Sequence, residues 1–106
     1  MSSNNITPLY DTGFDELVLS SDQPVLIKFS TKQCGPCKAL APIVDRIAAE
    51  VKGRCRVFSV DIDEAPRTAA RYGIRAVPTL LAFRGGAPRG QLVGLASREA
   101  IFKLIG

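Results

Sequence analysis

Apolar residues along the chain follow two different spacings. Compact β-rich runs, in which apolar residues are continuous or alternate with polar ones, predict strands. These runs lie at residues 6–9, 25–29, 57–61, 79–83 and 91–93. Longer segments with apolar residues three and four positions apart predict helices, because that spacing places the apolar side chains on one helical face. Strands and helices therefore alternate along most of the chain.

Four helices are expected between and after these strands. The longest carries its apolar face at residues 40, 43, 44, 47, 48 and 51. The Thr12 hydroxyl is predicted to cap a first helix, and the Ser97 hydroxyl a last one. A short helix over residues 66–72 is expected to end at Gly73, because glycine tolerates the left-handed conformation common after a helix.

The order βαβαβαββα predicts an α/β fold with one mixed central sheet of about five strands flanked by four helices. Helical connections between the early strands favour parallel pairing. The last two strands are joined by a short turn at residues 85–88 and are expected to be antiparallel. With 106 residues, 46% of them apolar, the chain can bury a core of its own. We therefore expect residues 1–106 to form a single domain.

Composition narrows the chemistry and the location. The absence of histidine excludes Ser-His and Cys-His catalytic pairs and imidazole metal ligands. Residues 1–6 have neither the basic nor the apolar region of a signal peptide, and apolar runs such as residues 25–27 are too short to cross a bilayer. We therefore expect a cytoplasmic protein with no membrane association.

Positive charge is concentrated in the second half of the chain. Residues 1–53 carry five Lys and Arg against six Asp and Glu, whereas residues 54–106 carry nine against four, so net charges of −1 and +5 sum to +4. Nucleic-acid binding requires basic residues in a run or stripe. The arginines of the second half are instead spread over several predicted elements. We expect a basic surface that influences the choice of protein partners and no nucleic-acid binding.

Cys34, Gly35, Pro36 and Cys37 lie between the second predicted strand and the long helix. Residues three apart at a helix start are close enough for their sulfurs to form a disulfide. The helix N-terminus favours the Cys34 thiolate. Gly35 allows close approach of another chain, and Pro36 occupies a position whose N–H the helix does not use. Zinc would need two more ligands, and only one further cysteine, Cys55, is present, so redox chemistry is favoured over metal binding.

Cys55 itself begins the third predicted strand, in register with Val57. Free cysteine is among the most buried residue types, so we expect Cys55 to be a core residue. A regulatory thiol is the alternative, because Arg54 and Arg56 would favour the thiolate of an exposed Cys55.

The chain resembles the thioredoxin family from about Ile6 to Ile105. The resemblance rests on an ordered set of motifs. These are Cys34-Gly-Pro-Cys37-Lys38 with Leu40-Ala-Pro42, Val60-Asp61-Ile62-Asp63, Tyr72-Gly73-Ile74-Arg75, Val77-Pro78-Thr79, Phe83 with Gly86, and Val93-Gly94. The resemblance implies the thioredoxin fold and a thiol-disulfide oxidoreductase that needs no cofactor besides its own redox-active disulfide.

The resemblance also implies roles for individual residues. Cys34 would attack a substrate disulfide, and Cys37 would resolve the mixed disulfide, leaving a Cys34–Cys37 disulfide. Pro78 would be cis and would present the Val77 backbone to an extended substrate segment. Gly94 would keep the floor of the substrate groove open. The groove would comprise Gln33, Val77, Pro78, Val93 and Gly94.

The sequence departs from the family pattern around the motif. Gln33 and Ser30 stand where the family usually has tryptophan, which removes aromatic contact area from the groove. This change is either tolerated variation or a change in the range of partners. Lys28 stands in place of a buried aspartate, and Ser59 in place of the lysine that usually accompanies it.

Three hypotheses follow for Lys28. A charged Lys28 would favour the Cys37 thiolate and make the pair more oxidising. An uncharged Lys28 could accept a proton in the resolving step. Alternatively, the side chain reaches solvent and has little effect.

We predict a cytoplasmic, monomeric protein-disulfide reductase that acts on disulfide-containing substrate proteins and is re-reduced by a thioredoxin reductase, without bound cofactor or metal. One alternative is a partner-specific binding subunit or clamp in which the dithiol is incidental. The other is a more oxidising disulfide exchanger or isomerase, which Lys28 favours and the Gly35-Pro36 pair disfavours.

Overall fold

The computed structural model describes residues 5–106. The prediction that residues 1–6 are not a signal peptide therefore falls mostly on residues outside the described part. The elements of the described part, in chain order, are β1 (Ile6–Leu9), η1 (Asp15–Leu19), β2 (Val25–Ser30), α1 (Gly35–Glu50), β3 (Arg56–Asp61), α2 (Pro66–Arg71), β4 (Thr79–Arg84), β5 (Ala87–Val93) and α3 (Arg98–Ile105). Within residues 5–106, the predicted order of strands and helices is confirmed.

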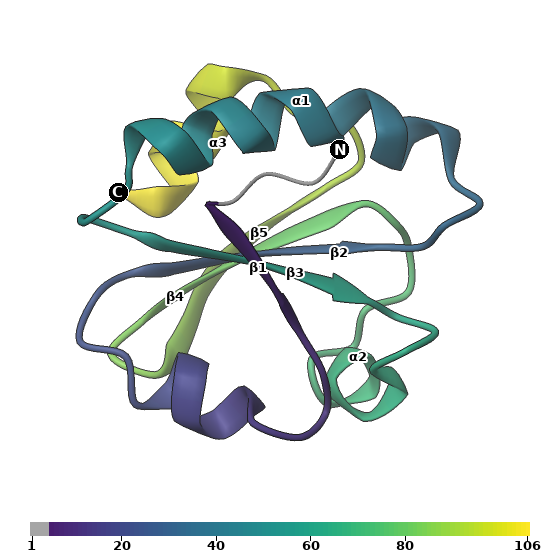
Figure 1. Ribbon diagram of the computed structural model, residues 1–106. Helices are drawn as coiled ribbons and strands as arrows, with labels where there is room; N and C mark the ends of the chain where they lie inside the picture. Colours follow the sequence, from purple (N-terminus) through teal and green to yellow (C-terminus); the bar gives the residue numbers. More distant parts are fainter. Residues whose placement is uncertain (1–4) are drawn as a thin grey trace.

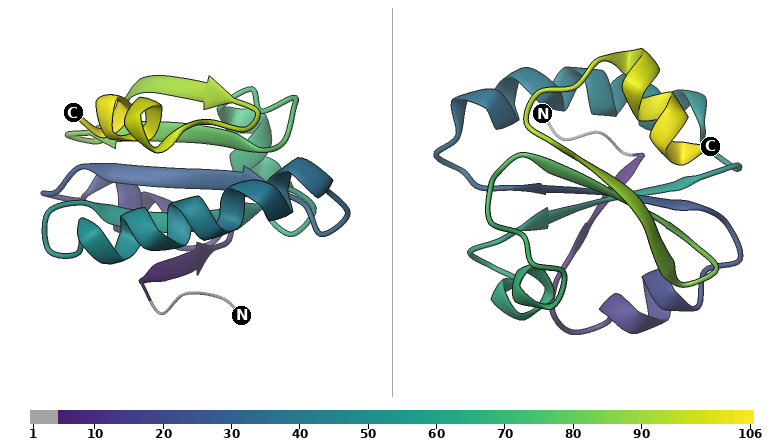
Figure 2. Two further views of the ribbon diagram at one scale, coloured as in Figure 1. Left: turned by 90° about the horizontal axis from the view of Figure 1, so that it is seen from above. Right: turned by 180° about the vertical axis from the view of Figure 1, so that it is seen from behind.

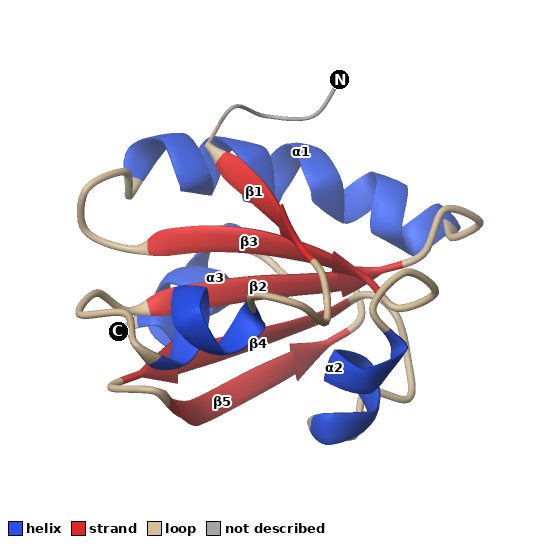
Figure 3. Ribbon diagram, turned by 60° about the horizontal axis from the view of Figure 1, so that its bottom comes forward, coloured by secondary structure: helices blue, strands red, loops and turns tan. Residues whose placement is uncertain are grey.

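The strands form one mixed sheet in the order β1-β3-β2-β4-β5 (Figure 3). β3 pairs parallel with β1 and β2, whereas β4 pairs antiparallel with β2 and β5. The carboxyl ends of β1, β2, β3 and β5 therefore point toward the same end of the sheet. The β2–α1 connection, which ends at Cys34, and the first turn of α1, which contains Cys37, lie at this end.

Helices cover both faces of the sheet, with α1 and α3 on one side and η1 and α2 on the other (Figures 1 and 2). The central strand β2 supplies side chains to both layers of core. Leu26 packs in the cluster beneath α1 and α3, whereas Val25, Ile27 and Phe29 pack in the cluster beneath η1 and α2. Each such buried side chain contributes roughly 1.5–3 kcal/mol. Because side chains alternate along a strand, Lys28 faces the α1 side, like Leu26.

α1 begins earlier than its apolar pattern indicates. Leu40, Val44 and Ile47 are fully buried against the sheet, which confirms the predicted apolar face. The helix starts at Gly35 with Cys34 as its N-cap residue, which confirms the predicted position of Cys34 at the helix N-terminus. In the first turn, the Cys34 Sγ accepts a hydrogen bond from the Cys37 N–H, and Pro36 has no N–H that needs a partner.

The cap predicted at Thr12 is wrong. Phe14 occupies the N-cap position of η1, which is a π-helical turn without a side-chain cap hydrogen bond. Gly13 precedes it with a φ of +91°, and its carbonyl accepts a hydrogen bond from the Leu17 N–H at 3.2 Å. This glycine bend places Thr12 two residues before the N-cap position, too early to cap the helix. The other predicted cap is confirmed, since the Ser97 hydroxyl accepts from the Ala100 N–H at 3.1 Å.

The hairpin between β4 and β5 is tighter than predicted. Its turn consists of Gly85 and Gly86, with φ values of +62° and +79°, a pair of left-handed conformations that suits a two-residue hairpin. β5 therefore begins at Ala87 and includes Pro88, which the sequence pattern assigns to the turn. Proline is tolerated there because β5 is an edge strand and the ladder shifts register opposite Pro88.

Candidate functional site

Cys34 and Cys37 form a disulfide at the start of α1, with a Cα–Cα distance of 5.2 Å. The Cys37 N–H donates a hydrogen bond to the Cys34 Sγ at 3.1 Å, so this sulfur occupies the cap position of the helix. Cys34 is half-buried and Cys37 is 5% exposed. An incoming group can reach the first sulfur, while the second lies behind it. Because a helix N-terminus favours negative charge, the same position favours a Cys34 thiolate when the disulfide is reduced.

The Val77–Pro78 peptide bond is cis, as predicted. The Val77 carbonyl oxygen lies 3.9 Å from the Cys34 Sγ, a van der Waals contact because a disulfide sulfur has no proton to donate. The Thr79 hydroxyl donates to the Ala76 carbonyl at 2.7 Å. These contacts hold the loop before β4 directly beside the reactive sulfur.

Gly94 connects this loop to the end of β5. Its N–H donates to the Pro78 carbonyl at 2.8 Å, and its φ is +89°. No protein atom lies within 4 Å of the position that a Cβ would occupy. Glycine is therefore favoured at this position by its left-handed backbone conformation and not by steric crowding within the protein. The space above Gly94 is open.

The residues flanking the disulfide differ in polarity. Gln33 is exposed on the β2–α1 connection. Val93 and Leu95, on either side of Gly94, are 59% and 60% exposed. Leu95 was absent from the residues that the sequence singled out, although its place directly after Gly94 was a usable signal.

Lys28 is half-buried on the side of β2 that faces α1. Burial lowers the pKa of its ammonium group, and Asp45 of α1 opposes this shift. It pairs in the sheet with Ser59 of β3 and Leu80 of β4, and among residues 5–106 it makes no ion pair within 4 Å. The side chain is thus neither fully solvated nor fully buried.

Cys55 is 5% exposed and packs in the cluster beneath α1, as predicted. Burial raises the pKa of its thiol to about 11, although Arg84 and the Leu26 backbone favour the thiolate. The thiol makes a long contact of 3.7 Å to the Arg56 carbonyl. At neutral pH it is a protonated core residue, which disfavours the regulatory hypothesis.

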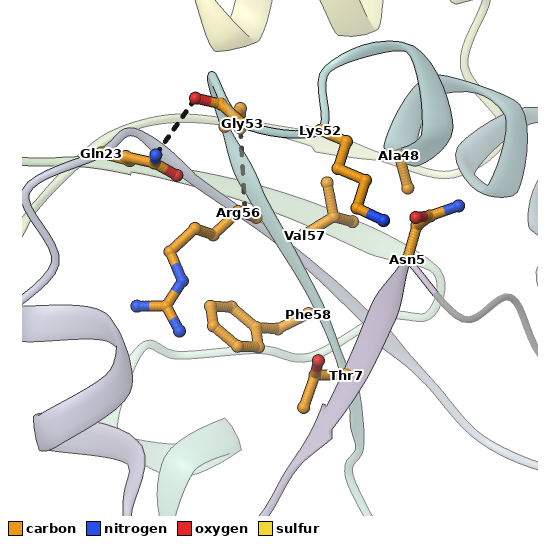
Figure 4. Close-up of a pocket in the computed structure, with 10 residues that line it drawn as sticks. Asn5, Thr7, Gln23, Ala48, Lys52, Gly53, Arg56, Val57 and Phe58 are labelled. Atoms are coloured by element: carbon orange, nitrogen blue, oxygen red, sulfur yellow. Dashed lines mark hydrogen bonds between the residues drawn. The ribbon is translucent and has the colours of Figure 1, made fainter.

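A hollow of about 190 Å³ lies at the opposite end of the sheet, where β3 begins (Figure 4). Its basic side chains, Lys52 and Arg56, point in different directions. Arg56 donates to the Leu17 carbonyl at 3.3 Å, and the Gln23 amide donates to the Gly53 carbonyl at 3.1 Å. These polar groups serve the fold and do not converge on one ligand position.

Residues 5–106 contain neither a cluster of metal-binding side chains nor a helix that could span a membrane. No group of three or more cysteine or carboxylate side chains there could hold a metal ion. No helix in the same part of the chain is long and apolar enough to span a membrane.

Residues 5–106 match the family model described as Thioredoxin. The chain belongs to the thioredoxin family. It is 41% identical over 103 residues to Thioredoxin of Rickettsia felis, covering 97% of this chain and 95% of that protein. It is 43% identical over 91 residues to Thioredoxin 1 of Nostoc sp., covering 86% and 85%. It is also 42% identical over 97 residues to Thioredoxin M4, chloroplastic, of Arabidopsis thaliana, covering 92% and 50%.

Family membership and the disulfide together establish the class of activity. The chain is a protein-disulfide oxidoreductase of the thioredoxin family, with the Cys34–Cys37 disulfide as its redox-active group. The predicted α/β fold is confirmed, with a mixed five-stranded sheet and four helical segments within residues 5–106. This outcome favours an enzyme over a clamp in which the dithiol is incidental.

Proposed function

We propose that this protein reduces the disulfides of other proteins in the cytoplasm, as a monomer whose single domain spans residues 1–106. The observation that supports this proposal is the pairing of a half-buried Cys34 at a helix N-terminus with a buried Cys37. The disulfide carries two electrons by itself, so the reaction requires no bound cofactor. A thioredoxin reductase would return the disulfide to the dithiol.

Reduction proceeds in two exchange steps. The Cys34 thiolate attacks one sulfur of the substrate disulfide, forms a mixed disulfide and releases the other substrate sulfur as a thiolate, which takes up a proton. The Cys37 thiolate then attacks the Cys34 sulfur and releases the second substrate thiolate. The substrate gains two electrons and two protons, and the Cys34–Cys37 pair loses them.

The loop before β4 and the end of β5 would hold the substrate during this exchange. The Val77 backbone lies beside Cys34, as the 3.9 Å contact indicates, and can pair with an extended substrate segment. The open space above Gly94 leaves room for that segment. Gln33, Val93 and Pro78 would complete the groove, and Gly35 and Pro36 would allow approach from the helix side.

Insulin reduction tests the proposal. The reduced protein, supplied with NADPH and a thioredoxin reductase, is expected to turn over insulin disulfides catalytically. Consumption of NADPH and precipitation of the insulin B chain are the readouts. A protein with free Cys34 and Cys37 that gives no turnover with insulin, and none with dithiothreitol as the reductant, would contradict a reducing role.

Lys28 supports a second candidate function, that of a more oxidising disulfide exchanger or isomerase. Lys28 is half-buried on the side of β2 that α1 covers, where Coulomb interactions are stronger than in bulk water. Asp45 favours the charged form of Lys28, although burial opposes it. A charged Lys28 would favour the Cys37 thiolate and would stabilise the reduced pair relative to the disulfide.

Equilibration with glutathione separates the two functions. The fraction of oxidised Cys34–Cys37 pair is measured over a range of glutathione ratios for the wild type and for Lys28→Met. An oxidising role predicts that Lys28→Met makes the pair more reducing. If Lys28 instead accepts the proton of the resolving step, the variant alters the pH profile of that step and leaves the equilibrium unchanged.

A further inference from the structure

Thr79 is one of two polar side chains that are buried among residues 5–106. It is 2% exposed, and the other, Thr68, is 4% exposed. The Thr79 hydroxyl donates a hydrogen bond to the Ala76 carbonyl at 2.7 Å. The Thr68 hydroxyl donates to the Asp11 carboxylate at 2.8 Å. Because a buried hydroxyl costs free energy unless it is hydrogen-bonded, the contribution of Thr79 depends on its bond to the loop before β4.

The Thr79 side chain has a rigid support. Thr79 is the first residue of β4 and pairs with Phe29 of β2 on one side and with Val93 of β5 on the other. Its side chain is branched at Cβ, which restricts the rotation of the hydroxyl group about the Cα–Cβ bond. The hydroxyl is therefore held in a fixed position, from which it reaches back to the loop before β4.

The loop itself has few other restraints. Among residues 5–106, no backbone–backbone hydrogen bond involves residues 75–77. The Val77 N–H has no hydrogen-bond partner within the described part of the chain. In the same part of the chain, the bond from the Thr79 hydroxyl is therefore the hydrogen bond that orients the Ala76–Val77 peptide group.

The direction of the Ala76 carbonyl sets the direction of the Val77 N–H. The Ala76–Val77 peptide bond is trans, whereas the Val77–Pro78 bond is cis. In a planar trans peptide group, the carbonyl and the following N–H point in opposite directions. A carbonyl that points toward the buried Thr79 hydroxyl therefore directs the Val77 N–H away from it. The Val77 carbonyl oxygen lies 3.9 Å from the Cys34 Sγ, so this unpaired donor belongs to a residue in contact with the reactive sulfur.

We propose that Thr79 is a positioning residue for substrate binding. Its hydroxyl fixes the Ala76–Val77 peptide group so that the Val77 N–H donates to a backbone carbonyl of the substrate segment beside the attacked disulfide. Thr79 acts through the loop and not on the sulfurs themselves. The inference rests on the proposed reduction of protein disulfides, in which the Val77 backbone pairs with an extended substrate segment.

Thr79→Val tests the proposal, because valine is close to threonine in shape and lacks the hydroxyl. Reduced protein is mixed with excess disulfide, quenched with acid and alkylated, and its oxidation is measured by mass spectrometry. The substrates are a disulfide-linked peptide dimer and hydroxyethyl disulfide, which has no peptide backbone. For the peptide, the half-saturating concentration is expected to rise about fivefold with the maximum rate nearly unchanged, because roughly one hydrogen bond is lost. For hydroxyethyl disulfide, the rate is expected to stay within about twofold.

Two further variants separate positioning from stability. Thr79→Ser keeps the hydroxyl and is expected to keep the half-saturating concentration for the peptide within about twofold of the wild type, although a buried methyl group is lost. Thr68→Val is the matched control, because it removes the other buried hydroxyl, which bonds Asp11 and not the loop. This control is expected to lose stability without any change in the half-saturating concentration. Urea unfolding measures the stability of all three variants.

A binding measurement tests Thr79 independently of turnover. The oxidised, isotope-labelled protein is titrated with the same peptide carrying Ser in place of Cys, and amide NMR shifts are followed. The Val77 amide proton is expected to move downfield in the wild type and in Thr79→Ser, and much less in Thr79→Val. An equal Val77 shift in the wild type and in Thr79→Val would overturn the proposal.

Three kinetic results would also overturn the positioning role of Thr79. These are a Thr79→Val protein with the half-saturating concentration of the wild type, a Thr68→Val protein with the same loss as Thr79→Val, and an equal loss with hydroxyethyl disulfide and with the peptide. Failure of the reducing function gives a different result, since the reduced wild type would then be oxidised by neither disulfide. In that case the NMR titration decides the role of Thr79.

Discussion

Cys34 and Cys55 occupy opposite ends of the same sheet and have opposite chemistry. Cys34 follows the carboxyl end of β2, is half-buried and caps α1. Cys55 precedes the amino end of β3, is 5% exposed and has a pKa raised by burial to about 11. Each cysteine lies next to one of the two parallel strands β2 and β3. Solvent access and the helix N-terminus make one of them a nucleophile and leave the other a core residue.

The basic neighbours of Cys55 show why sequence proximity is a poor guide to its chemistry. Arg54 donates to the Glu50 carbonyl at 2.9 Å, and Arg56 donates to the Leu17 carbonyl at 3.3 Å. The arginine that favours the Cys55 thiolate is Arg84, from β4. Its influence is weaker than that of burial, so the thiol stays protonated at neutral pH.

The largest expected difference between the two cysteines is catalytic. Cys34→Ser should abolish insulin reduction, a loss of more than about 10³-fold, because serine cannot form the mixed disulfide. Cys55→Ala should keep turnover within about twofold, because this side chain does not touch the reacting sulfurs. Reductase-coupled assays measure both variants. A strong loss of turnover in a folded Cys55→Ala protein would contradict the conclusion that Cys55 takes no part in the reaction.

Alkylation of the reduced native protein measures the difference directly. With iodoacetamide at pH 8, Cys34 is expected to react at least about 100-fold faster than Cys55, because a pKa near 11 leaves on the order of one Cys55 thiol in a thousand ionised. Mass spectrometry of digested protein gives both rates. Similar rates for the two cysteines in folded protein would show that Cys55 is accessible and reactive.

The buried thiol also predicts a pH dependence of stability. Its pKa is 9.0 in the reference state and about 11 in the fold. The protonated form is thus favoured by folding, so its contribution is complete below pH 9 and is lost as the pH rises through 11. Two pKa units correspond to about 2–3 kcal/mol. In urea unfolding, the stability of the wild type relative to Cys55→Ala should fall by this amount between pH 8 and pH 11.5.

If the difference in the free energy of unfolding between wild type and Cys55→Ala stays constant over that pH range, Cys55 is not a buried, protonated thiol. Because the wild type and Cys55→Ala share all other titratable groups, the contributions of those groups cancel in the comparison. Burial also raises the pKa of Tyr72 and lowers that of Lys28, but both groups are present in each protein.

Lys28 gives the smallest predicted effect on stability. Its effect has the opposite sign to that of Cys55. Burial lowers its pKa from 10.5, so folding disfavours its charged form at neutral pH. This penalty is complete below the pKa of the folded state and disappears as the pH rises to 10.5. Lys28→Met is expected to stabilise the fold by about 1 kcal/mol at pH 7, a typical size for a single substitution, with a smaller gain at high pH.

Lys103→Met is the matched control, because Lys103 lies exposed on α3. Chemical denaturation at pH 7 and pH 10.5 should show no comparable pH-dependent gain for this variant. A folded Lys28→Met protein that is less stable than the wild type at pH 7 would show that the lysine is favourably paired.

Local spacing in the sequence was sufficient to predict most of the fold. Continuous apolar runs placed the strands, and helical periodicity placed the buried face of α1. The Cys34–Cys37 spacing indicated a redox pair, and the resemblance to the thioredoxin family supplied the cis bond at Pro78. These features depend on residues near one another in the chain or on an ordered set of motifs.

Contacts between distant residues decided the rest. The Asp11 carboxylate, which is distant from α2 in the sequence, caps this helix. It accepts hydrogen bonds from the Thr68 N–H and the Thr68 hydroxyl, both at 2.8 Å, and from the Arg67 N–H at 3.2 Å. The Thr12 cap failed because a neighbouring glycine bend set the start of η1.

The environment of each ionisable group likewise required the tertiary structure. The sequence by itself determined which residues could titrate and where the reactive pair lies. Only the fold determined that Cys55 is buried beneath α1 and that Lys28 is half-buried near Asp45. It also brought Arg75 beside Val93. The physical reason is that desolvation and charge interactions depend on distance in space, which sequence spacing sets only within one element.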